Sequence, residues 1–409
     1  MNNNFKRLKY ACYTINLSMS VVGNMPPLLF IIFRNEYGLS FSFLGFLVLL
    51  NFLTQLGVDL VFSFFSHKFS MPKTVKSMPY ITFAGLFVYS VFPLFIKSYA
   101  HIGLMLGTII FSASAGLAEV LISPIIASLP SDDPDREMSR LHSVYAWGVV
   151  PVILLTTLLL KIFGNENWQY IVFFFMLLPV VSVILFSGVD VPDISSPQRV
   201  SGVIEFLKDK TVWLFVFAIF FCGAAECTMA QWASGYIEKA LGIKKIYGDI
   251  FGVTLFSVML GIGRTLYGKK GKNIIAVLTY GSLGAFICYL FCALCPWRLG
   301  GLIACVLTGF FTSMLWPGCL VVSSERFLSS GVLIYALMAA GGDMGAAIVP
   351  QLVGLITDGI IKNNGLAFIA NKGILIEEIA MKSGILIASV FPLAAFFSFL
   401  KIKKLRKSK

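Results

Sequence analysis

Four carboxylic acids stand inside long apolar stretches of this sequence, where a charged group is costly. Asp59, Glu119, Glu226 and Asp343 each lie well within a stretch long enough to cross a bilayer. An acid at the centre of a membrane helix costs about 2.5–3.5 kcal/mol on an insertion scale. None has a cation within its own stretch, so we expect all four to face protein, water or one another. Burial favours the protonated form of a carboxylate, which makes these acids candidates for proton coupling.

Uncharged polar residues accompany the acids at helical spacing. Stripes with this spacing are Asn16, Ser20 and Asn24; Asn51, Gln55 and Asp59; and Ser112, Glu119 and Ser123. Such stripes fit a polar cavity or hydrogen bonds between helices, and the sequence leaves both interpretations open. Sugar-like ligands need amide groups beside aromatic faces. The candidate substrate-binding residues are Asn24, Asn51, Gln55, Trp147, Gln231, Trp232, Trp316 and Gln351.

Two further predictions concern the tryptophans and the residues near Glu226. Trp168, Trp213 and Trp297 lie at or just beyond the ends of apolar stretches and are interpreted as interface anchors. In the stretch of Glu226, Gln231 and Trp232 lie about 140° and about 240° round the helix from the acid. They share a cavity with it only if the helix is broken or rotated near Gly223 or Gly235.

The elements that must position these residues are membrane helices. Of 409 residues, 57% are hydrophobic and 13% charged, whereas soluble domains carry about a quarter charged residues. Stretches of about 20 apolar residues can span a bilayer, and the lack of alternation favours helices over barrel strands. The predicted spans are 10–33, 41–65, 77–96, 101–128, 142–162, 168–188, 211–239, 247–268, 274–292, 299–324, 330–360 and 383–402. The first lacks a small-residue cleavage site and is interpreted as a membrane helix rather than a signal peptide.

The spans fall into two sets of six, separated by the polar stretch 188–210. We therefore predict an all-α membrane protein with an N-terminal bundle (1–188), a cytoplasmic linker (189–210) and a C-terminal bundle (211–409). Six spans on each side of a linker are typical of transporters built from two repeats. No sequence identity between the halves is evident, so the equivalence is one of hydropathy alone.

The net charge of +12 is distributed unevenly along the chain. If the N-terminus is cytoplasmic, 22 of the 32 Lys and Arg residues, Arg264 and six tail residues among them, fall on the cytoplasmic side. The positive-inside rule then places both termini in the cytoplasm of a multi-pass protein of the cell membrane. The basic tail is expected to lie near anionic lipid headgroups, and nucleic-acid binding is excluded.

Patterns typical of enzymes and metal sites are missing. The eight cysteines lie in apolar spans or just past their ends, and the Cys292–Cys295 pair has no His or second pair beside it. His67, His101 and His142 lie near span ends or in loops, and no nucleophile–base set stands out. The "GKKGK" at 268–272 lacks the spacing of a phosphate-binding loop. We expect no catalytic activity, metal or cofactor.

At this point the sequence resembles the major facilitator superfamily. The loop "GIGRTLYGKKGK" between spans eight and nine is similar to that superfamily's Gly-Arg-rich loop, whereas "FSFFSHKFSMPKTVK" after span two lacks the usual Asp-Arg and glycines. Within the superfamily, four patches resemble the L-fucose:proton symporter group: "GLAEVLISP", "GAAECTMAQWASGYIEKALG", "SSERF" and "AAGGDMGAAIVPQLVG". The resemblance implies two six-helix bundles that work by alternating access.

The resemblance also implies roles for single residues. Glu119 matches the group's acid in span four, which is implied to handle the proton, and Glu226 and Trp232 match an acid and a tryptophan of span seven. The chain departs from the group in two places. Val120 and Ser123-Pro124 replace a Thr and a later Asn-Pro, and span one carries no acid. Asp59 or Asp343 can therefore share the proton-coupling role.

Three functions remain open. The first is proton-coupled symport of a sugar or similar polar small molecule, by a protein expected to be monomeric. The second is proton-driven efflux of amphipathic compounds, which the 38 phenylalanines favour. The third is a non-transporting membrane receptor or scaffold with the same fold; a membrane enzyme ranks below all three.

Overall fold

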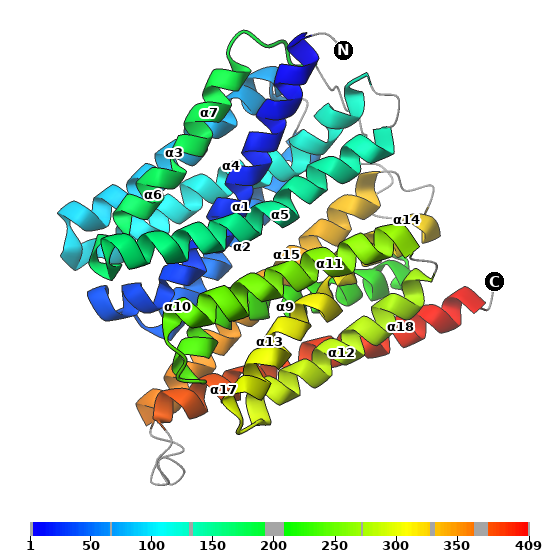
Figure 1. The fold of residues 1–409 in the computed structure, drawn as a ribbon. Coiled ribbons are helices and arrows are strands. Elements are labelled where there is room, and N and C mark those ends of the chain that lie inside the picture. Colours follow the sequence, from blue (N-terminus) through cyan, green and yellow to red (C-terminus); the bar gives the residue numbers. More distant parts are fainter. Residues whose placement is uncertain are drawn as a thin grey trace. The chain divides into compact units, whose positions relative to one another are not determined.

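The computed structural model describes residues 3–65, 68–130, 134–192, 208–270, 273–327, 332–363 and 375–407. Within these ranges the regular structure is helical, and no strand occurs (Figure 1). Contacts divide the chain into two compact units, the first made of residues 1–39 and 50–200 and the second of residues 40–49 and 201–409. The predicted all-α class is confirmed.

The first unit holds the N-terminal helices. They are α1 (Asn3–Tyr37), most of α2 (Phe41–Phe65), α3 (Met71–Phe95), α4 (Ala100–Ser128), α5 (Pro134–Phe163), α6 (Gln169–Phe175) and α7 (Leu177–Phe186). The predicted sixth span is divided at Met176 into α6 and α7. Leu8 and Cys12 of α1, Met78 of α3 and Ile122 of α4 are buried in one apolar core.

The second unit holds the C-terminal helices and the beginning of α2. They are α9 (Lys210–Lys239), α10 (Lys245–Gly248), the π-helical turn η5 (Asp249–Thr254), α11 (Leu255–Lys270), α12 (Ile274–Leu294), α13 (Arg298–Thr312), α14 (Leu315–Arg326), α15 (Val332–Asn363), α17 (Ile376–Ala388) and α18 (Val390–Lys407). Three predicted spans are each made of more than one helix, because the chain departs from α-helical geometry at η5, at Ser313–Met314 and at Ser389.

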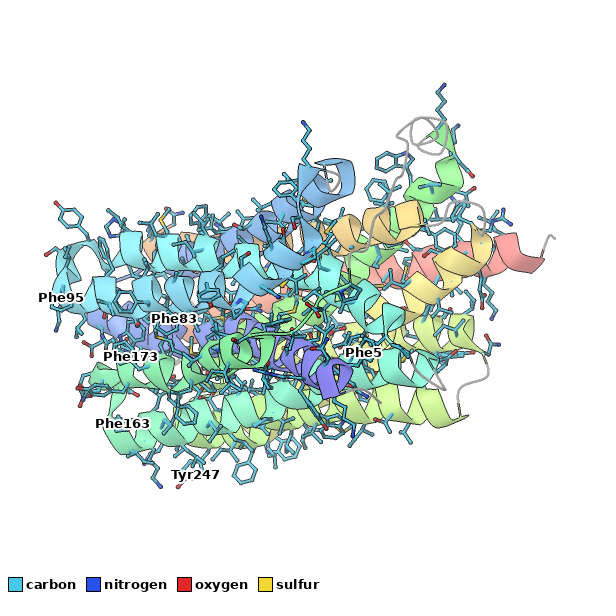
Figure 2. The ribbon with its side chains drawn as sticks, turned by 90° about the horizontal axis from the view of Figure 1, so that it is seen from above. Phe5, Phe83, Phe95, Phe163, Phe173 and Tyr247 are labelled. Carbon is cyan, nitrogen blue, oxygen red and sulfur yellow. The ribbon has the colours of Figure 1, made fainter. Side chains whose placement is uncertain are left out.

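The twelve predicted spans are recovered as helices. Eleven helical segments in the described residues are long and apolar enough to cross a membrane, and the span predicted at 142–162 corresponds to the shorter apolar segment Trp147–Phe163. Large apolar side chains on each unit are exposed, including Phe83, Phe95 and Phe163 of the first unit and Tyr247 of the second (Figure 2). Exposed aromatic surface of this kind fits contact with lipid.

The sequence analysis placed residues 40–49 in the N-terminal bundle. In the structure they group with the second unit, where Asp358 of α15 accepts hydrogen bonds from the backbone N–H groups of Phe41 (3.1 Å) and Ser42 (2.6 Å). A carboxylate in this position satisfies N–H groups that have no partner within their own helix. Most of the predicted linker, residues 193–207, lies outside the described residues.

Gly341 and Gly345 of α15 allow close packing against α9. A Cβ at Gly341 would lie 3.0 Å from the carbonyl oxygen of Val216, and one at Gly345 would overlap the carbonyl of Phe220. Both carbonyls belong to α9. Only glycine permits this approach of two helix backbones.

The predicted role of Trp168 as an interface anchor is wrong. Its side chain is fully buried, its indole N–H donates to the hydroxyl of Tyr37 (3.1 Å), and its ring packs edge-on against Phe33 at 4.9 Å between centroids. The tertiary fold covers a residue whose sequence position at a span end suggested the interface. Trp213 and Trp297 are 44% and 60% exposed, as anchors require.

Candidate functional site

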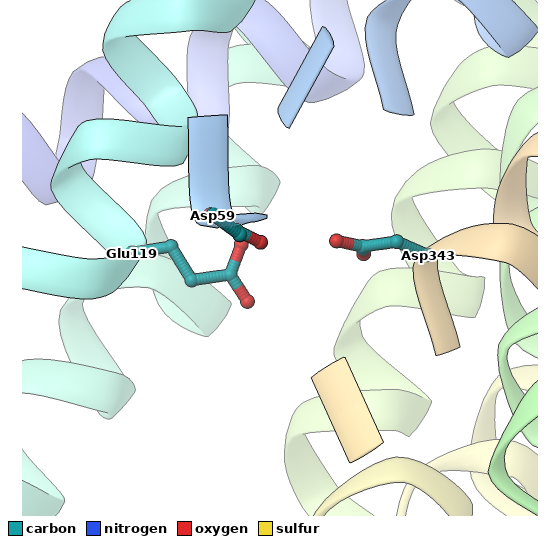
Figure 3. A group of neighbouring side chains, drawn as sticks. All are labelled: Asp59, Glu119 and Asp343. Atoms are coloured by element: carbon teal, nitrogen blue, oxygen red, sulfur yellow. The ribbon is translucent and has the colours of Figure 1, made fainter. Parts of the chain in front are cut away.

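In the first unit, the structure brings Asp59 of α2 and Glu119 of α4 together. Their carboxylate oxygens lie within 4.8 Å of each other, and the two side chains point toward one another (Figure 3). Both oxygens of Asp59 are buried and have no hydrogen-bond partner among the described residues, while the Glu119 side chain is exposed. No Lys, Arg or His in the described part of the chain pairs with either acid. Two carboxylates at this distance repel one another when both are charged, so the pair favours holding a proton between them.

A close approach of two backbones makes this pairing possible. Gly116 lies one turn before Glu119, and a Cβ there would be 3.1 Å from the Cα and carbonyl oxygen of Gln55 and from the Cβ of Val58. Gln55 lies one turn before Asp59 on α2. Because glycine at position 116 has no side chain, α2 and α4 can lie this close together beside the two acids. Two carboxylates supply hard oxygen ligands, but Ca²⁺ or Mg²⁺ takes six or more, so this pair alone does not form such a site.

The amides of the Asp59 stripe are engaged in helix contacts. Asn51 is buried, and its side-chain oxygen accepts a hydrogen bond from the Ser112 hydroxyl of α4 at 2.6 Å. Gln55 is also buried, and its amide lies 3.5 Å from the backbone oxygen of Asn51. The interaction of Asn51 with Ser112 ties α2 to α4, which is the helix–helix interpretation of the stripe.

The polar stripe of the first span also forms hydrogen bonds between helices. Asn16 donates to the carbonyl of Leu141 (2.7 Å) and Ser20 to the carbonyl of Tyr145 (3.0 Å), so both tie α1 to α5. Asn24 donates to the carbonyl of Ser20 within its own helix (3.0 Å). Trp147 of α5, predicted to bind substrate, is 48% exposed. The substrate-binding roles of Asn24 and Trp147 therefore remain predictions.

In the second unit, Glu226 of α9 has a partner that the sequence did not indicate. Its Oε1 accepts a hydrogen bond from Nη2 of Arg264 on α11 at 3.0 Å. The side chains are 15% and 29% exposed, so both charges are largely removed from solvent. The second carboxylate oxygen is buried without a hydrogen-bond partner among the described residues. Glu226 is therefore an ion-paired acid, unlike Asp59 and Glu119.

Arg264 also binds the chain where the tenth span is interrupted. α13 ends at Thr312 and α14 begins at Leu315, and the Nε–H of Arg264 donates to the carbonyl of Ser313 between them (3.0 Å). A carbonyl at such a break lacks its partner one turn ahead, so a side-chain donor is needed inside a membrane. Gly263 allows the approach, because a Cβ there would lie 2.7 Å from that of Ser313.

Trp316 lies one turn beyond the break and packs against two glycines. A Cβ at Gly223 of α9 would lie 2.9 Å from the indole ring, and one at Gly342 of α15 would overlap it. Gly223 is one turn before Glu226, and Gly342 directly precedes the buried Asp343, which Figure 3 also draws. The contacts around Trp316 thus place an aromatic ring one turn from the ion pair.

Gln231 and Trp232 lie apart from Glu226, because α9 is continuous from Lys210 to Lys239. The Trp232 ring is 1% exposed, and its N–H donates to the carbonyl of Pro350 in α15 at 2.9 Å. Gln231 is buried as well. Neither condition for a shared cavity, a break near Gly223 or near Gly235, is met.

Two further polar features lie in the second unit, the side chain of Gln351 and a hydrogen-bonded network at η5. Gln351 of α15, a predicted substrate residue, has a buried side-chain oxygen without a hydrogen-bond partner among the described residues. A network that the sequence analysis missed lies at η5. Lys245 donates to Asp249 and to the Ser234 hydroxyl, each at 2.8 Å, and Asp249 is 1% exposed.

The main residue that the sequence analysis missed is Arg264. It was counted among the cytoplasmic charges, although the predicted span 247–268 contains it. A cation inside a span together with an acid inside another is the signal that would have found the pair.

The family profile of the Major Facilitator Superfamily matches residues 11–358. No curated protein matches the sequence. Among solved structures, a bacterial homologue of the human lysosomal transporter Spinster, in an inward-facing and unoccupied conformation, is 14% identical with a TM-score of 0.72, over 100% of this chain and 99% of that one. The D-xylose–proton symporter is 16% identical with a TM-score of 0.69, over 95% and 96%.

The fucose:proton symporter of E. coli is 14% identical with a TM-score of 0.59, over 97% of this chain and 99% of that one. At these identities the likeness concerns the fold, and in each case it extends over nearly the whole chain. The family profile covers most of the sequence, and the helices supply the membrane spans that such a protein needs. The chain is therefore a multi-pass membrane protein that belongs to the major facilitator superfamily.

Proposed function

We propose that this protein is a secondary transporter that couples the movement of a sugar or similar polar small molecule to protons. The observation that carries the proposal is the pair of Asp59 and Glu119 in the first unit. Two carboxylates within 4.8 Å of each other, with no cationic partner among the described residues, suit a group that gains and loses one proton. Hydrogen-bonding and aromatic groups of the second unit support a polar substrate.

The nature of the substrate is supported by the second unit and by related folds. Arg264 and Glu226 supply donors and acceptors, and Trp316 supplies an aromatic face one turn away. Sites for polar ligands combine such groups. Structural neighbours include symporters for D-xylose and fucose and a nucleoside transporter, NupG. Glu226 and Asp343 remain predicted as further proton-coupling residues, and the proposal places both termini in the cytoplasm.

The test uses purified protein in proteoliposomes with a pH-sensitive dye outside. A panel of sugars is added to wild-type protein, to Glu119→Gln and to Asp59→Asn. Glu36→Gln serves as the matched control, because Glu36 is an exposed acid at the end of α1. We expect one sugar to raise the external pH with wild type and with the control, and to have no effect with either variant of the pair.

Two outcomes would contradict the proposal. Undiminished sugar-driven alkalinisation by both variants would remove the proton-coupling role of the pair. A folded wild-type protein that responds to no sugar, but acidifies or alkalinises the medium with amphipathic cations, would favour proton-driven efflux instead. Binding of a sugar without accumulation would favour a receptor.

A further inference from the structure

The ion pair of Glu226 and Arg264 has a feature that bears on substrate selection. Arg264 uses only two of its five guanidinium N–H groups on described residues, one on Ser313 and one on Glu226. The arginine side chain is 29% exposed, and the other oxygen of Glu226 has no hydrogen-bond partner among the described residues. With respect to the residues that the structure describes, the pair therefore retains donors and one acceptor that are not used within the second unit.

The surroundings of the pair indicate a binding surface rather than a structural ion pair alone. Ionisable side chains within membrane spans face the bundle interior or a water-filled cavity, and interrupted helices mark binding sites in transporters. Here the arginine holds the interruption of the tenth span at Ser313, and Trp316 lies one turn further along the same span. The ring contacts Gly223, one turn before the glutamate that pairs with the guanidinium.

A guanidinium with free N–H groups is the preferred partner of a carboxylate, which it binds through two parallel hydrogen bonds. Glu226 already occupies part of this capacity and cancels the positive charge. An anionic substrate that approached Arg264 would meet the negative charge of Glu226 at the same place. A neutral hydroxylated substrate would meet a donor and an acceptor without a net repulsion.

We propose that Glu226 is a specificity residue that excludes negatively charged substrates by neutralising Arg264. The inference rests on the proposed transport of a polar small molecule and adds the charge class of that molecule, which is a neutral sugar rather than a sugar acid. It gives Glu226 a role in substrate selection in addition to the proton-coupling role predicted for it. Removal of the carboxylate exposes an uncompensated cation, and removal of the guanidinium exposes an uncompensated anion.

The test uses a neutral sugar that the wild-type protein transports. It measures how strongly transport of this sugar is inhibited by the corresponding uronic acid, by the methyl ester of that acid and by the 2-amino derivative of the sugar. In Glu226→Gln we expect the uronic acid to inhibit at a concentration at least about tenfold lower than in wild type, because a charge-assisted pair forms. The uncharged methyl ester should gain no such advantage. In Arg264→Gln the gain should move to the positively charged amino sugar, and in the double variant both gains should vanish.

A readout without transport separates this inference from the proposed function. The same ligands are added to purified protein, and the thermal unfolding midpoint is measured. Stabilisation of Glu226→Gln by the uronic acid but not by its ester would support the inference even if no variant transports. If Glu226→Gln does not fold, Arg264→Gln carries the test through its preference for the amino sugar. Equal inhibition by all three derivatives in every folded variant would overturn the inference, while wild-type transport of the neutral sugar would leave the proposed function intact.

Discussion

Replacement of Gly116 by alanine tests the closest approach between α2 and α4. The added Cβ would lie 3.1 Å from three atoms of α2, two of which belong to the backbone of Gln55. Ordinary contacts of a Cβ begin near 3.4 Å, so α2 must move away by a few tenths of an ångström. Overpacking of this kind costs about 1–3 kcal/mol, and a single methyl group belongs near the lower end.

The same displacement acts on the acid pair. Glu119 follows Gly116 by one turn and Asp59 follows Gln55 by one turn, so the helices separate at the point where the carboxylates face each other. We expect Gly116→Ala to be less stable than an alanine variant that gains the same helix propensity without this contact, and to show lower proton-coupled uptake. Gly116→Val should lower the stability and the uptake further, because a branched side chain adds two carbon atoms to the same contact.

Gly57 provides the control for this experiment. It lies on α2 between Gln55 and Asp59, but a Cβ at Gly57 would have no heavy atom within 4 Å. Alanine there gains helix propensity, about 1 kcal/mol in water, without a packing cost. Gly57→Ala should therefore be at least as stable as wild type, and the two alanine variants should differ by about 1–3 kcal/mol.

The assay is unfolding of each purified variant in detergent, followed by tryptophan fluorescence, together with sugar-driven alkalinisation in proteoliposomes. If Gly116→Ala and Gly57→Ala have the same free energy of unfolding and the same rate of transport, α2 and α4 do not approach each other as closely as in the structure. Loss of transport with unchanged stability would mean that Gly116 acts on the site by another route than packing.

Two further substitutions test contacts of the second unit. Asp358→Asn should destabilise the protein by about 1–2 kcal/mol, because the carboxylate that accepts two backbone N–H groups of α2 loses its charge and one acceptor; unchanged unfolding in detergent would refute the capping role. Trp232→Phe removes the hydrogen bond to Pro350 and should cost about 0.5–1.5 kcal/mol, with the loss in stability rather than in substrate affinity. A tenfold weaker half-saturation concentration in Trp232→Phe would instead place this ring against the substrate.

Much of the architecture follows from local properties of the chain. Hydropathy is a sum over neighbouring residues, so the twelve spans and the all-α class are readable without knowledge of any partner. The same holds for Gly341 and Gly345, whose spacing predicts a close helix contact on any neighbour. The break at Ser313–Met314 also has a local cause, because Pro317 has no N–H to donate to the Ser313 carbonyl four residues earlier.

The candidate site depended on which helices meet and how each is rotated. Asp59 and Glu119 were both singled out by their cost in a membrane, but their pairing required α2 and α4 to pack at Gly116. Arg264 and Glu226 are 38 residues apart and belong to different spans, so no local pattern joins them.

The amide stripes show the same division between local pattern and tertiary contact. Their helical spacing was visible in the sequence, and the choice between a cavity and a helix contact was not. Asn16 donates to a carbonyl of α5 and Asn51 accepts from a hydroxyl of α4, contacts that exist only once the helices are assembled. A side chain's chemistry is a property of the sequence, whereas its partner is set by long-range packing, and here that packing decided which acid is paired with a cation and which faces another acid.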